Sequence, residues 1–182
     1  MIEVNNLSFT YKAGGKTAVD GITFDVKKGE VFGFLGPSGA GKSTTQKVLI
    51  RLLKNYSGSA KIQGKEIAGL NGDFYNMIGV GFELPNHYPR LTARENLSFF
   101  ASFYNRKTVN PLELLKMVGL EAYADAKTST FSKGMKMRLN FIRALLHNPD
   151  ILFLDEPTSG LDPVNARNIK NIITRLKNEG KT

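Results

Sequence analysis

Apolar residues follow two different spacings along the chain, and the change between them divides the sequence into regions. Short segments that alternate between apolar and polar residues, or are continuously apolar, are predicted strands, and they lie at residues 2–9, 19–26, 31–35, 60–63, 77–82 and 151–154. The runs 31–35 and 151–154 are apolar and bounded by turn signals, which is typical of strands buried on both faces. A Gly-containing turn at 13–16 joins the first two strands.

The region from about residue 84 to 147 has the period and the start signals of helices. Each helix predicted in this region, and the helix predicted after residue 161, is preceded by a residue whose side chain can bind free N–H groups of a helix N-terminus. These residues are Thr92, which is followed by Glu95, Asn110, which is followed by Pro111, Ser132, and Asp162, which is followed by Pro163. A further helix follows residue 41 and extends to about Leu53. Because strands flank the helical block, the sequence predicts one α/β domain over residues 1–182, with a helical lobe inserted at about 84–147.

Composition and charge restrict the class of protein. The 182 residues are 41% hydrophobic and 23% charged, an ordinary globular composition. Cysteine is absent, which excludes disulfides, Cys-ligated zinc and thiol nucleophiles. The net charge of +9 is spread over both halves, whereas a nucleic-acid arm or a polybasic anchor would concentrate it. No apolar run approaches the ~18 residues of a membrane-spanning helix, so a membrane role would need a partner subunit.

A phosphate-binding loop is the strongest chemical signal. The pattern G-x-x-x-x-G-K-[ST] is matched by Gly36, Pro37, Ser38, Gly39, Ala40, Gly41, Lys42 and Ser43. Glycines let backbone N–H groups wrap a phosphate, and the following helix adds its dipole. Lys42 would reach the β- and γ-phosphates, and the Ser43 hydroxyl would bind Mg²⁺. With Thr44, these residues predict an ATP–Mg²⁺ site; the alternative is a glycine-rich turn with an exposed lysine.

Two adjacent carboxylates follow the apolar run 151–154. In parallel α/β folds, ligands bind at the carboxyl ends of strands, where Asp155 and Glu156 stand. Asp155 is predicted to hold the metal through its water shell, and Glu156 to act as the general base that polarises the attacking water. The alternative is a pair of solvated acids at a strand end.

Three further motifs narrow the class: residues 131–135 (Phe-Ser-Lys-Gly-Met), residues 159–162 (Ser-Gly-Leu-Asp), and Tyr11, which precedes the loop. With the loop and the carboxylates, they resemble the nucleotide-binding subunit of an ABC transporter over the whole chain. The resemblance implies a P-loop NTPase with a RecA-like core, an N-terminal antiparallel β-subdomain and an inserted helical subdomain. The family's usual signature is Ser-Gly-Gly-Gln; the variant with Lys133 and Met135 resembles the ABC-2-type exporter branch.

The resemblance implies head-to-tail pairing of two subunits. Ser132, Lys133 and Gly134 would contact the γ-phosphate of ATP held by the other subunit, and Asp162 would lie at the dimer seam. Two alternatives stay open. Ser132 and Asp162 are also plausible N-caps of the helices that they precede, and Lys133 could be a surface residue.

Other roles also come from the resemblance. Tyr11 would stack on adenine, although a strand tyrosine is more often a core or surface residue. Glu83 stands where the family usually has glutamine and would remain a magnesium-side residue. Residues 84–91 would line the groove that receives a membrane subunit. His87 is expected to face solvent near this groove, and His147 to lie at a helix C-terminus.

The resemblance implies an ATP-binding and ATP-hydrolysing subunit on the cytoplasmic face of the cell membrane. It would pair with itself or a paralogous ATPase and power export of a drug, antibiotic, lipid or ion through a transmembrane permease. Nucleic acid is not an expected partner. The family's switch histidine follows a strand that would begin where this chain stops, at Thr182. The chain is therefore expected to be truncated and to bind ATP, with its own hydrolysis left open.

The alternatives come from other classes. Soluble ABC ATPases of DNA repair, chromosomes or ribosomes carry coiled-coil insertions, zinc modules or tandem domains, none of which the sequence contains. A nucleotide-binding module without catalysis is a further possibility. A small-molecule kinase would leave residues 131–135 and Asp162 without a role.

Overall fold

The computed structural model describes residues 1–12 and 15–182, so the turn predicted at 13–16 falls partly outside the described residues. The chain divides into two compact units, one of residues 1–74 with 180–182 and one of residues 75–179. No helix in the described part of the chain is long and apolar enough to cross a bilayer.

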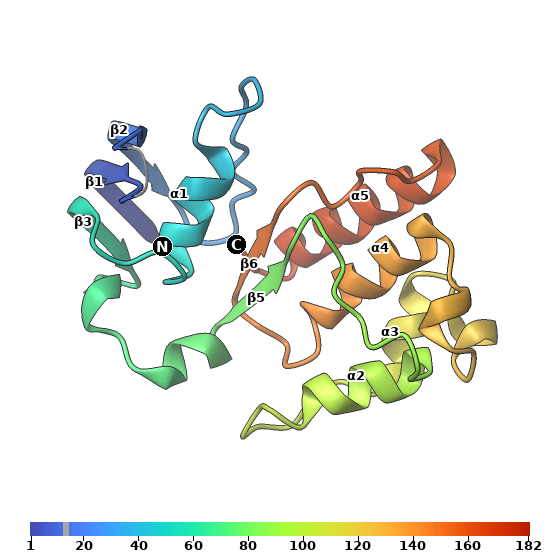
Figure 1. Ribbon diagram of the computed structural model, residues 1–182. Coiled ribbons are helices and arrows are strands. Elements are labelled where there is room, and N and C mark those ends of the chain that lie inside the picture. Colours follow the sequence, from blue (N-terminus) through green and yellow to red (C-terminus); the bar gives the residue numbers. More distant parts are fainter. Residues whose placement is uncertain (13–14) are drawn as a thin grey trace. The chain divides into compact units, whose positions relative to one another are not determined.

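The first unit is built on an antiparallel sheet with the strand order β2-β1-β3-β4 (Figure 1). Strand β1 pairs with neighbours on both sides, so that Ile2 faces Val26 of β2 and Ile62 of β3. The N-terminal antiparallel β-subdomain is thereby confirmed. The elements of this unit are β1 (Ile2–Thr10), β2 (Thr17–Val26), α1 (Lys42–Leu49), β3 (Ser57–Ile62), β4 (Lys65–Glu66) and the 3-10 helix η1 (Ile67–Gly69).

Residues 31–35 do not form a strand, and the prediction of a buried strand there is wrong. Leu35 is 97% exposed. The ring of Phe32 stacks on Phe24 of β2 with 5.0 Å between centroids, and Phe34 packs edge-on against the same ring at 5.3 Å. An apolar pattern shows which side chains favour burial, but a strand also needs a neighbour that pairs with its backbone. No sheet of the described residues includes this segment.

Helix α1 ends earlier than predicted, at Leu49 instead of about Leu53. Arg51 has φ 63, the left-handed conformation that commonly ends helices. The N–H group of Leu52 donates back to the carbonyl of Lys47 at 2.9 Å. This turn provides hydrogen-bond donors for the last carbonyls of the helix. The spacing of apolar residues does not predict such a turn.

The second unit contains a parallel pair of strands, β5 and β6, with Ile78 opposite Ile151 and Gly81 opposite Leu154 (Figure 1). Both strands were predicted at these positions, and they are confirmed. The elements of this unit are β5 (Ile78–Gly81), α2 (Ala93–Ala101), α3 (Pro111–Met117), α4 (Lys133–Arg143), β6 (Ile151–Leu154), α5 (Pro163–Asn178), and the 3-10 helices η3 (Glu121–Tyr123) and η4 (Thr128–Thr130). The 3-10 helix η2 (Gly72–Asn76) spans the boundary between the units in sequence.

The helix starts are where the capping residues predicted them. Thr92 accepts a hydrogen bond from the N–H of Glu95 at 3.1 Å, and the Glu95 carboxylate accepts one from the N–H of Thr92 at 2.8 Å. This reciprocal pair is the predicted capping box. Asn110 accepts from the N–H of Leu112 at 2.9 Å at the start of α3.

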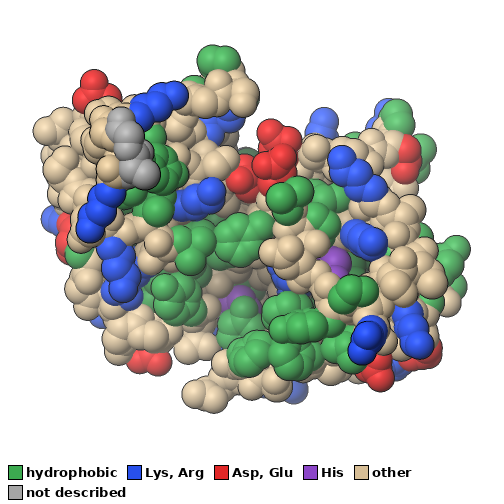
Figure 2. Space-filling view, viewed as in Figure 1, with side chains coloured by type: hydrophobic (Ala, Val, Ile, Leu, Met, Phe, Trp, Pro, Cys, Tyr) green, Lys and Arg blue, Asp and Glu red, His purple; other side chains and the backbone are tan. Residues whose placement is uncertain are grey.

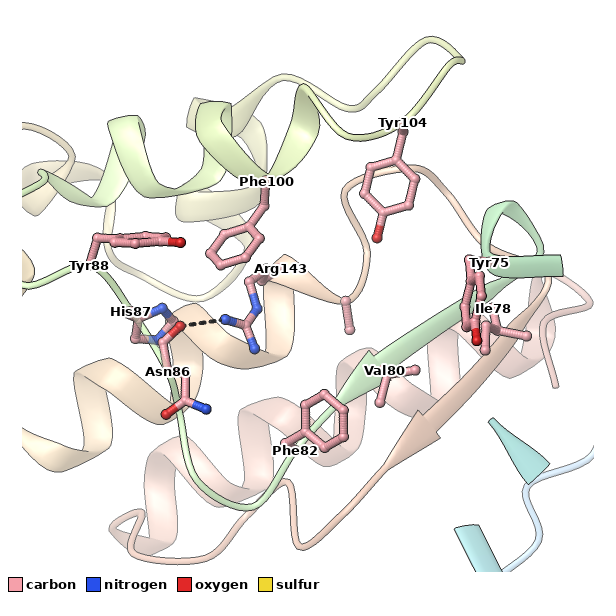
Figure 3. A pocket seen from close by; sticks show the side chains of 11 residues that line it. Tyr75, Ile78, Val80, Phe82, Asn86, His87, Tyr88, Phe100, Tyr104 and Arg143 are labelled. Atoms are coloured by element: carbon pink, nitrogen blue, oxygen red, sulfur yellow. Dashed lines mark hydrogen bonds between the residues drawn. The ribbon is translucent and has the colours of Figure 1, made fainter. Parts of the chain in front are cut away.

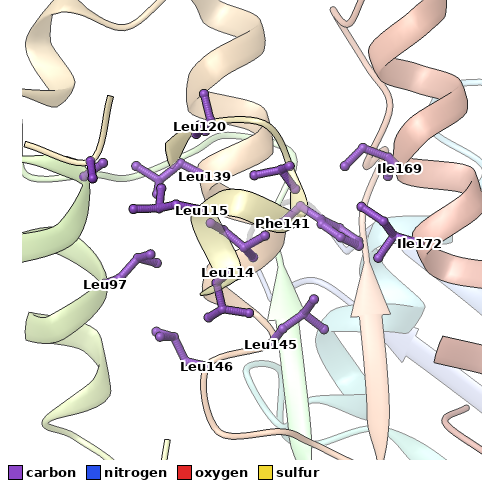
Figure 4. Packing of buried hydrophobic residues seen from close by; sticks show 14 of the residues in the cluster. Leu97, Leu114, Leu115, Leu120, Leu139, Phe141, Leu145, Leu146, Ile169 and Ile172 are labelled. Atoms are coloured by element: carbon purple, nitrogen blue, oxygen red, sulfur yellow. The ribbon is translucent and has the colours of Figure 1, made fainter. Parts of the chain in front are cut away.

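A hydrophobic core holds the helices of the second unit together (Figure 4). Leu97 of α2, Leu115 of α3, Leu139 of α4 and Ile169 of α5 are each at most 1% exposed and belong to one cluster. Full burial of such a side chain contributes about 1.5–3 kcal/mol. The cluster therefore fixes the positions of α4 and α5, whose N-termini carry two of the predicted site segments.

Candidate functional site

The phosphate-binding loop lies in the first unit, between the segment 31–35 and α1. Gly41 caps α1 with φ 90 and ψ 2, and a Cβ atom there would lie 2.3 Å from the carbonyl oxygen of Ala18 in β2. The loop is therefore folded tightly against the sheet in a way that only glycine permits. The first turn of α1 contains no acidic residue, so the positive end of the helix is available to an anion.

Lys42 folds back over this loop. Its ammonium group donates to the carbonyls of Gly36 and Pro37, at 2.8 Å each. These bonds hold the cation above the backbone that the motif supplies for a phosphate. A charged donor at this position would form strong hydrogen bonds with phosphate oxygens.

Tyr11 lies next to the same helix. Its hydroxyl is 3.2 Å from the hydroxyl of Thr44, and its ring packs edge-on against Phe9 with 5.0 Å between centroids. Tyr11 is 37% exposed, so part of the ring stays accessible for stacking. The structure thus brings Tyr11 and Thr44 together beside the loop.

The predicted carboxylates lie in the second unit, at the carboxyl ends of β5 and β6. The N–H of Asp155 donates to the carbonyl of Gly81 at 2.8 Å, which sets Asp155 beside the end of β5. Glu83 follows that end, so both acids stand at one edge of the parallel pair, where such folds bind ligands. Glu156 is exposed and has φ 48, a conformation that is rare for non-glycine residues and is found at active sites.

The described residues contain no cluster of three or more acidic, histidine or cysteine side chains for a metal ion. Mg²⁺ needs no such cluster, because it usually binds one or two carboxylates together with phosphates and waters. The hydroxyl of Ser43 in the first unit and the carboxylate of Asp155 in the second unit are each oxygen donors of this kind. Each residue type, taken within its own unit, fits a ligand of nucleotide-bound Mg²⁺.

The signature segment opens α4. The hydroxyl of Ser132 accepts a hydrogen bond from the N–H of Met135 at 3.2 Å and caps the helix. The side chain of Lys133 lies over Gly160, where a Cβ atom would come within 2.9 Å of its Cε. Residues 132–134 and 159–162 are thus neighbours within the second unit, although they are far apart in sequence.

Asp162 caps α5. Its carboxylate accepts from the N–H groups of Val164 and Asn165 at 3.0 Å each. Hydrogen bonds from the side chain and backbone of Asn165 hold the pKa of Asp162 below its usual value. The carboxylate therefore stays ionised and favours the positive end of the helix. The predicted N-cap roles of Ser132 and Asp162 are confirmed.

The two histidines differ from their predicted surroundings. His87 is half-buried and does not simply face solvent. Burial lowers its pKa to about 4, so its ring is neutral at pH 7. His147 is fully buried and lies beyond the end of α4 at Arg143. It contacts the carbonyl of Ile78 at 2.9 Å and stacks on Tyr104 at 3.9 Å, because the chain turns inward after the helix.

Sequence reasoning did not identify Arg143, which lines a cavity of the second unit (Figure 3). The only signal was a basic residue inside the apolar stretch 141–146. A helical lysine or arginine with that pattern usually extends its head group to water. Here Arg143 is only partly exposed, and its guanidinium lies 4.6 Å from the ring centroid of Phe100.

Comparisons with known proteins agree on one family. The family model described as ABC transporter matches residues 19–159. The fluoroquinolones export ATP-binding protein of Mycobacterium tuberculosis is 56% identical over 182 residues, which are 100% of this chain and 60% of the relative. The bacitracin transport ATP-binding protein BcrA of Bacillus licheniformis is 39% identical over 98% of this chain and 58% of its own length. The chain thus spans about 60% of the length of these curated relatives.

A solved structure gives the same result for the fold. A dimeric ATP-binding cassette in a post-hydrolysis state, bound to ADP and Pi, matches with a TM-score of 0.90 and 32% sequence identity. The match covers 100% of this chain and 85% of that one. The architecture of both units is therefore that of a P-loop ATPase cassette.

Proposed function

The chain belongs to the ABC transporter family, and we propose that it is the ATP-binding and ATP-hydrolysing subunit of an exporter. The observation that carries the proposal is the loop before α1, where Lys42 is held above the backbone carbonyls of Gly36 and Pro37 at a helix N-terminus free of acidic residues. This is the donor arrangement that a nucleotide phosphate requires. The name of the relative from Mycobacterium tuberculosis, a fluoroquinolones export ATP-binding protein, supports export as the direction of transport.

In this proposal each residue has a defined task toward Mg²⁺-ATP. Gly36 and residues 38–41 would donate backbone N–H groups to the phosphates, whereas Pro37 has none to donate, and Lys42 would neutralise the β- and γ-phosphates. Ser43 and Asp155 would supply oxygen ligands to Mg²⁺, directly or through water, and Glu83 would support the same water shell. The ion would supply positive charge that neutralises the phosphates.

Glu156 would orient the attacking water and take its proton, which is the role of a general base. Its exposed carboxylate and its φ of 48 support this assignment. Tyr11 would stack on adenine, with its ring braced by Phe9. Stacking of an aromatic side chain on a base contributes about 1–3 kcal/mol in other proteins.

We further infer a two-fold dimer with two nucleotides between the subunits. Residues 132–134 of one subunit would contact the γ-phosphate bound to the other, and Asp162 would lie at the seam. The second subunit is another copy or a paralogue. The dimer would lie on the cytoplasmic face of the membrane, and its closing and opening would drive a transmembrane permease to export a drug, antibiotic, lipid or ion.

The test measures binding of labelled ATP to the Lys42→Ala chain in a filter-binding assay. The control is Lys47→Ala, because Lys47 is an exposed lysine of the same helix. The Lys42→Ala chain should bind ATP about tenfold more weakly or worse, because it loses charged hydrogen bonds to the phosphates. The control should bind like wild type. In the full-length protein, Glu156→Gln should keep ATP binding and lose turnover by about 10²–10⁴-fold. Unchanged ATP binding by Lys42→Ala would refute the proposal.

A further inference from the structure

Asn71 and Gly72 are the only asparagine–glycine pair among the 182 residues. They lie in the first unit, between η1 and η2, and with Asp73 they are exposed to solvent. Figure 2 shows mostly polar surface where Figure 1 draws this stretch. Neither residue has a role in the nucleotide chemistry proposed above, and water reaches the peptide bond that joins them.

The backbone nitrogen of Gly72 is free to react. Gly72 opens η2, and the first N–H groups of a helix have no acceptor within the helix. The described residues offer this N–H group no other hydrogen-bond acceptor. A Cβ atom at Gly72 would meet nothing within 4 Å, so no neighbour crowds the residue. Glycine also lets the peptide rotate into conformations that a Cβ atom would restrict.

The side chain of Asn71 folds back toward the same peptide bond. Its Oδ1 atom accepts a hydrogen bond from the N–H of Asp73 at 3.0 Å, and its Nδ2 atom donates to the Asp73 carboxylate at 3.1 Å. This is an Asx turn, which holds the side-chain amide next to the backbone that follows it. The N–H of Asp73 also stabilises negative charge that develops on Oδ1 when a nucleophile attacks the amide carbon.

Arg51 adds a positive charge to the same peptide group. Its guanidinium donates to the carbonyl of Leu70 and lies 3.5 Å from the carbonyl oxygen of Asn71. The described residues form no ion pair with Arg51, so a carboxylate does not neutralise its charge. The carbonyl oxygen of Asn71 shares electrons with the nitrogen of Gly72 by resonance. A cation beside this oxygen therefore stabilises the anion that remains when the nitrogen loses its proton.

We propose that Asn71 is a self-modification site, at which the folded chain converts this asparagine to aspartate and isoaspartate with water as the only co-reactant. The nitrogen of Gly72 is the nucleophile and the side-chain amide of Asn71 is the electrophile. The N–H of Asp73 and the guanidinium of Arg51 promote the attack. The inference goes beyond the proposed function and does not depend on it, because none of these residues belongs to the nucleotide site.

The reaction balances without an oxidant or a reductant. The nitrogen of Gly72 loses its proton to hydroxide and bonds to Cγ of Asn71, which closes a succinimide ring. The bond between Cγ and Nδ2 breaks, and Nδ2 leaves as ammonia after taking a proton from water. A water molecule then opens the ring at either carbonyl. Opening at Cγ gives aspartate, and opening at the backbone carbonyl leaves the main chain running through Cγ, which is isoaspartate.

The experiment follows the folded full-length protein during incubation in water labelled with heavy oxygen. Peptide mass spectrometry measures the loss of each asparagine, and an isoaspartyl methyltransferase with a labelled methyl donor counts isoaspartate. Asn71 should react before the other asparagines, and its products should be aspartate and isoaspartate that each carry an oxygen atom from water. The rate should rise with pH, because the attacking nitrogen must lose its proton.

Variants then test the role of each group. Gly72→Ala should slow the reaction by about tenfold or more, because the added methyl group hinders ring closure, and the open space at Gly72 accommodates it. Arg51→Met should slow it by about threefold to fivefold, and Arg51→Lys should slow it less. Arg94→Met, which removes an exposed arginine of α2, should leave the rate unchanged. In urea, Arg51→Met and wild type should react equally fast, because only the folded chain holds the guanidinium beside Asn71.

Absence of isoaspartate at position 71 overturns the proposal, and so does earlier reaction of another asparagine. Aspartate formed without isoaspartate would mean direct hydrolysis of the side-chain amide, which overturns it as well. Equal rates for Arg51→Met and wild type in the folded chain would overturn the part assigned to Arg51. High salt gives a test on the wild-type chain that does not depend on the folding of any variant. It should slow the reaction of the folded chain by screening the charge of Arg51, and an unchanged rate would contradict that part.

Discussion

At Gly41 the phosphate-binding loop passes so close to β2 that a side chain has no room. A Cβ atom would lie 2.3 Å from the carbonyl oxygen of Ala18, and φ is 90. Gly41→Ala should therefore lower the free energy of unfolding of the chain by about 2 kcal/mol or more, measured by urea denaturation. The loss combines backbone strain with displacement of β2.

Gly39→Ala is the matched control for this residue. Gly39 has φ 81, but a Cβ atom there would meet nothing within 4 Å, so only the strain remains, at about 1–2 kcal/mol. A larger loss for Gly41→Ala than for Gly39→Ala would show that close packing against β2 shapes the loop. Equal losses would mean that the backbone conformation alone requires glycine.

At the scale of the element, Ser132 is the N-cap of α4, and a second role is proposed for it. Ser132→Ala should lower the free energy of unfolding by about 1 kcal/mol, because the N–H of Met135 loses its acceptor. Ser132→Asp should be within about 0.5 kcal/mol of wild type, because Asp caps as well as Ser. It should nevertheless weaken ATP-dependent dimerisation by about tenfold or more, since its charge repels a γ-phosphate.

Sedimentation velocity with and without ATP measures this difference, in a Glu156→Gln background that keeps the nucleotide intact. If Ser132→Asp dimerises as well as its background, Ser132 is only a cap. The pair of variants separates the two readings that the sequence left open, since one removes the cap and the other keeps it.

Structural features that depend only on residues close in sequence could be predicted from the sequence. The capping box of Thr92 and Glu95 and the N-cap of Asp162 each depend on residues within one turn, and the structure contains them. The segment 31–35 could not be assigned correctly, because a strand depends on a partner elsewhere in the chain. The partial burial of Arg143 also depends on a distant residue, Phe100, whose ring centroid lies 4.6 Å from its guanidinium.

At the scale of the whole molecule, head-to-tail pairing predicts that two differently mutated subunits can complement each other in one dimer. In such a dimer, each site takes Glu156 from the subunit that holds the nucleotide and Ser132 from the other subunit. A homodimer of Glu156→Gln lacks the base at both sites, and a homodimer of Ser132→Asp lacks an intact signature at both. A mixed dimer has both defects at one site and neither at the other.

Mixing the two inactive full-length variants in equal amounts should therefore restore ATP hydrolysis. At chain concentrations high enough for Ser132→Asp to dimerise, random exchange makes about half of the dimers mixed, each with one intact site, so turnover should approach about a quarter of wild type. If both residues acted on nucleotide held by their own subunit, every site in the mixture would stay defective and no activity would return. A coupled-enzyme ATPase assay on the mixture, compared with each variant alone, distinguishes the two arrangements, because only residues acting across the dimer can complement each other.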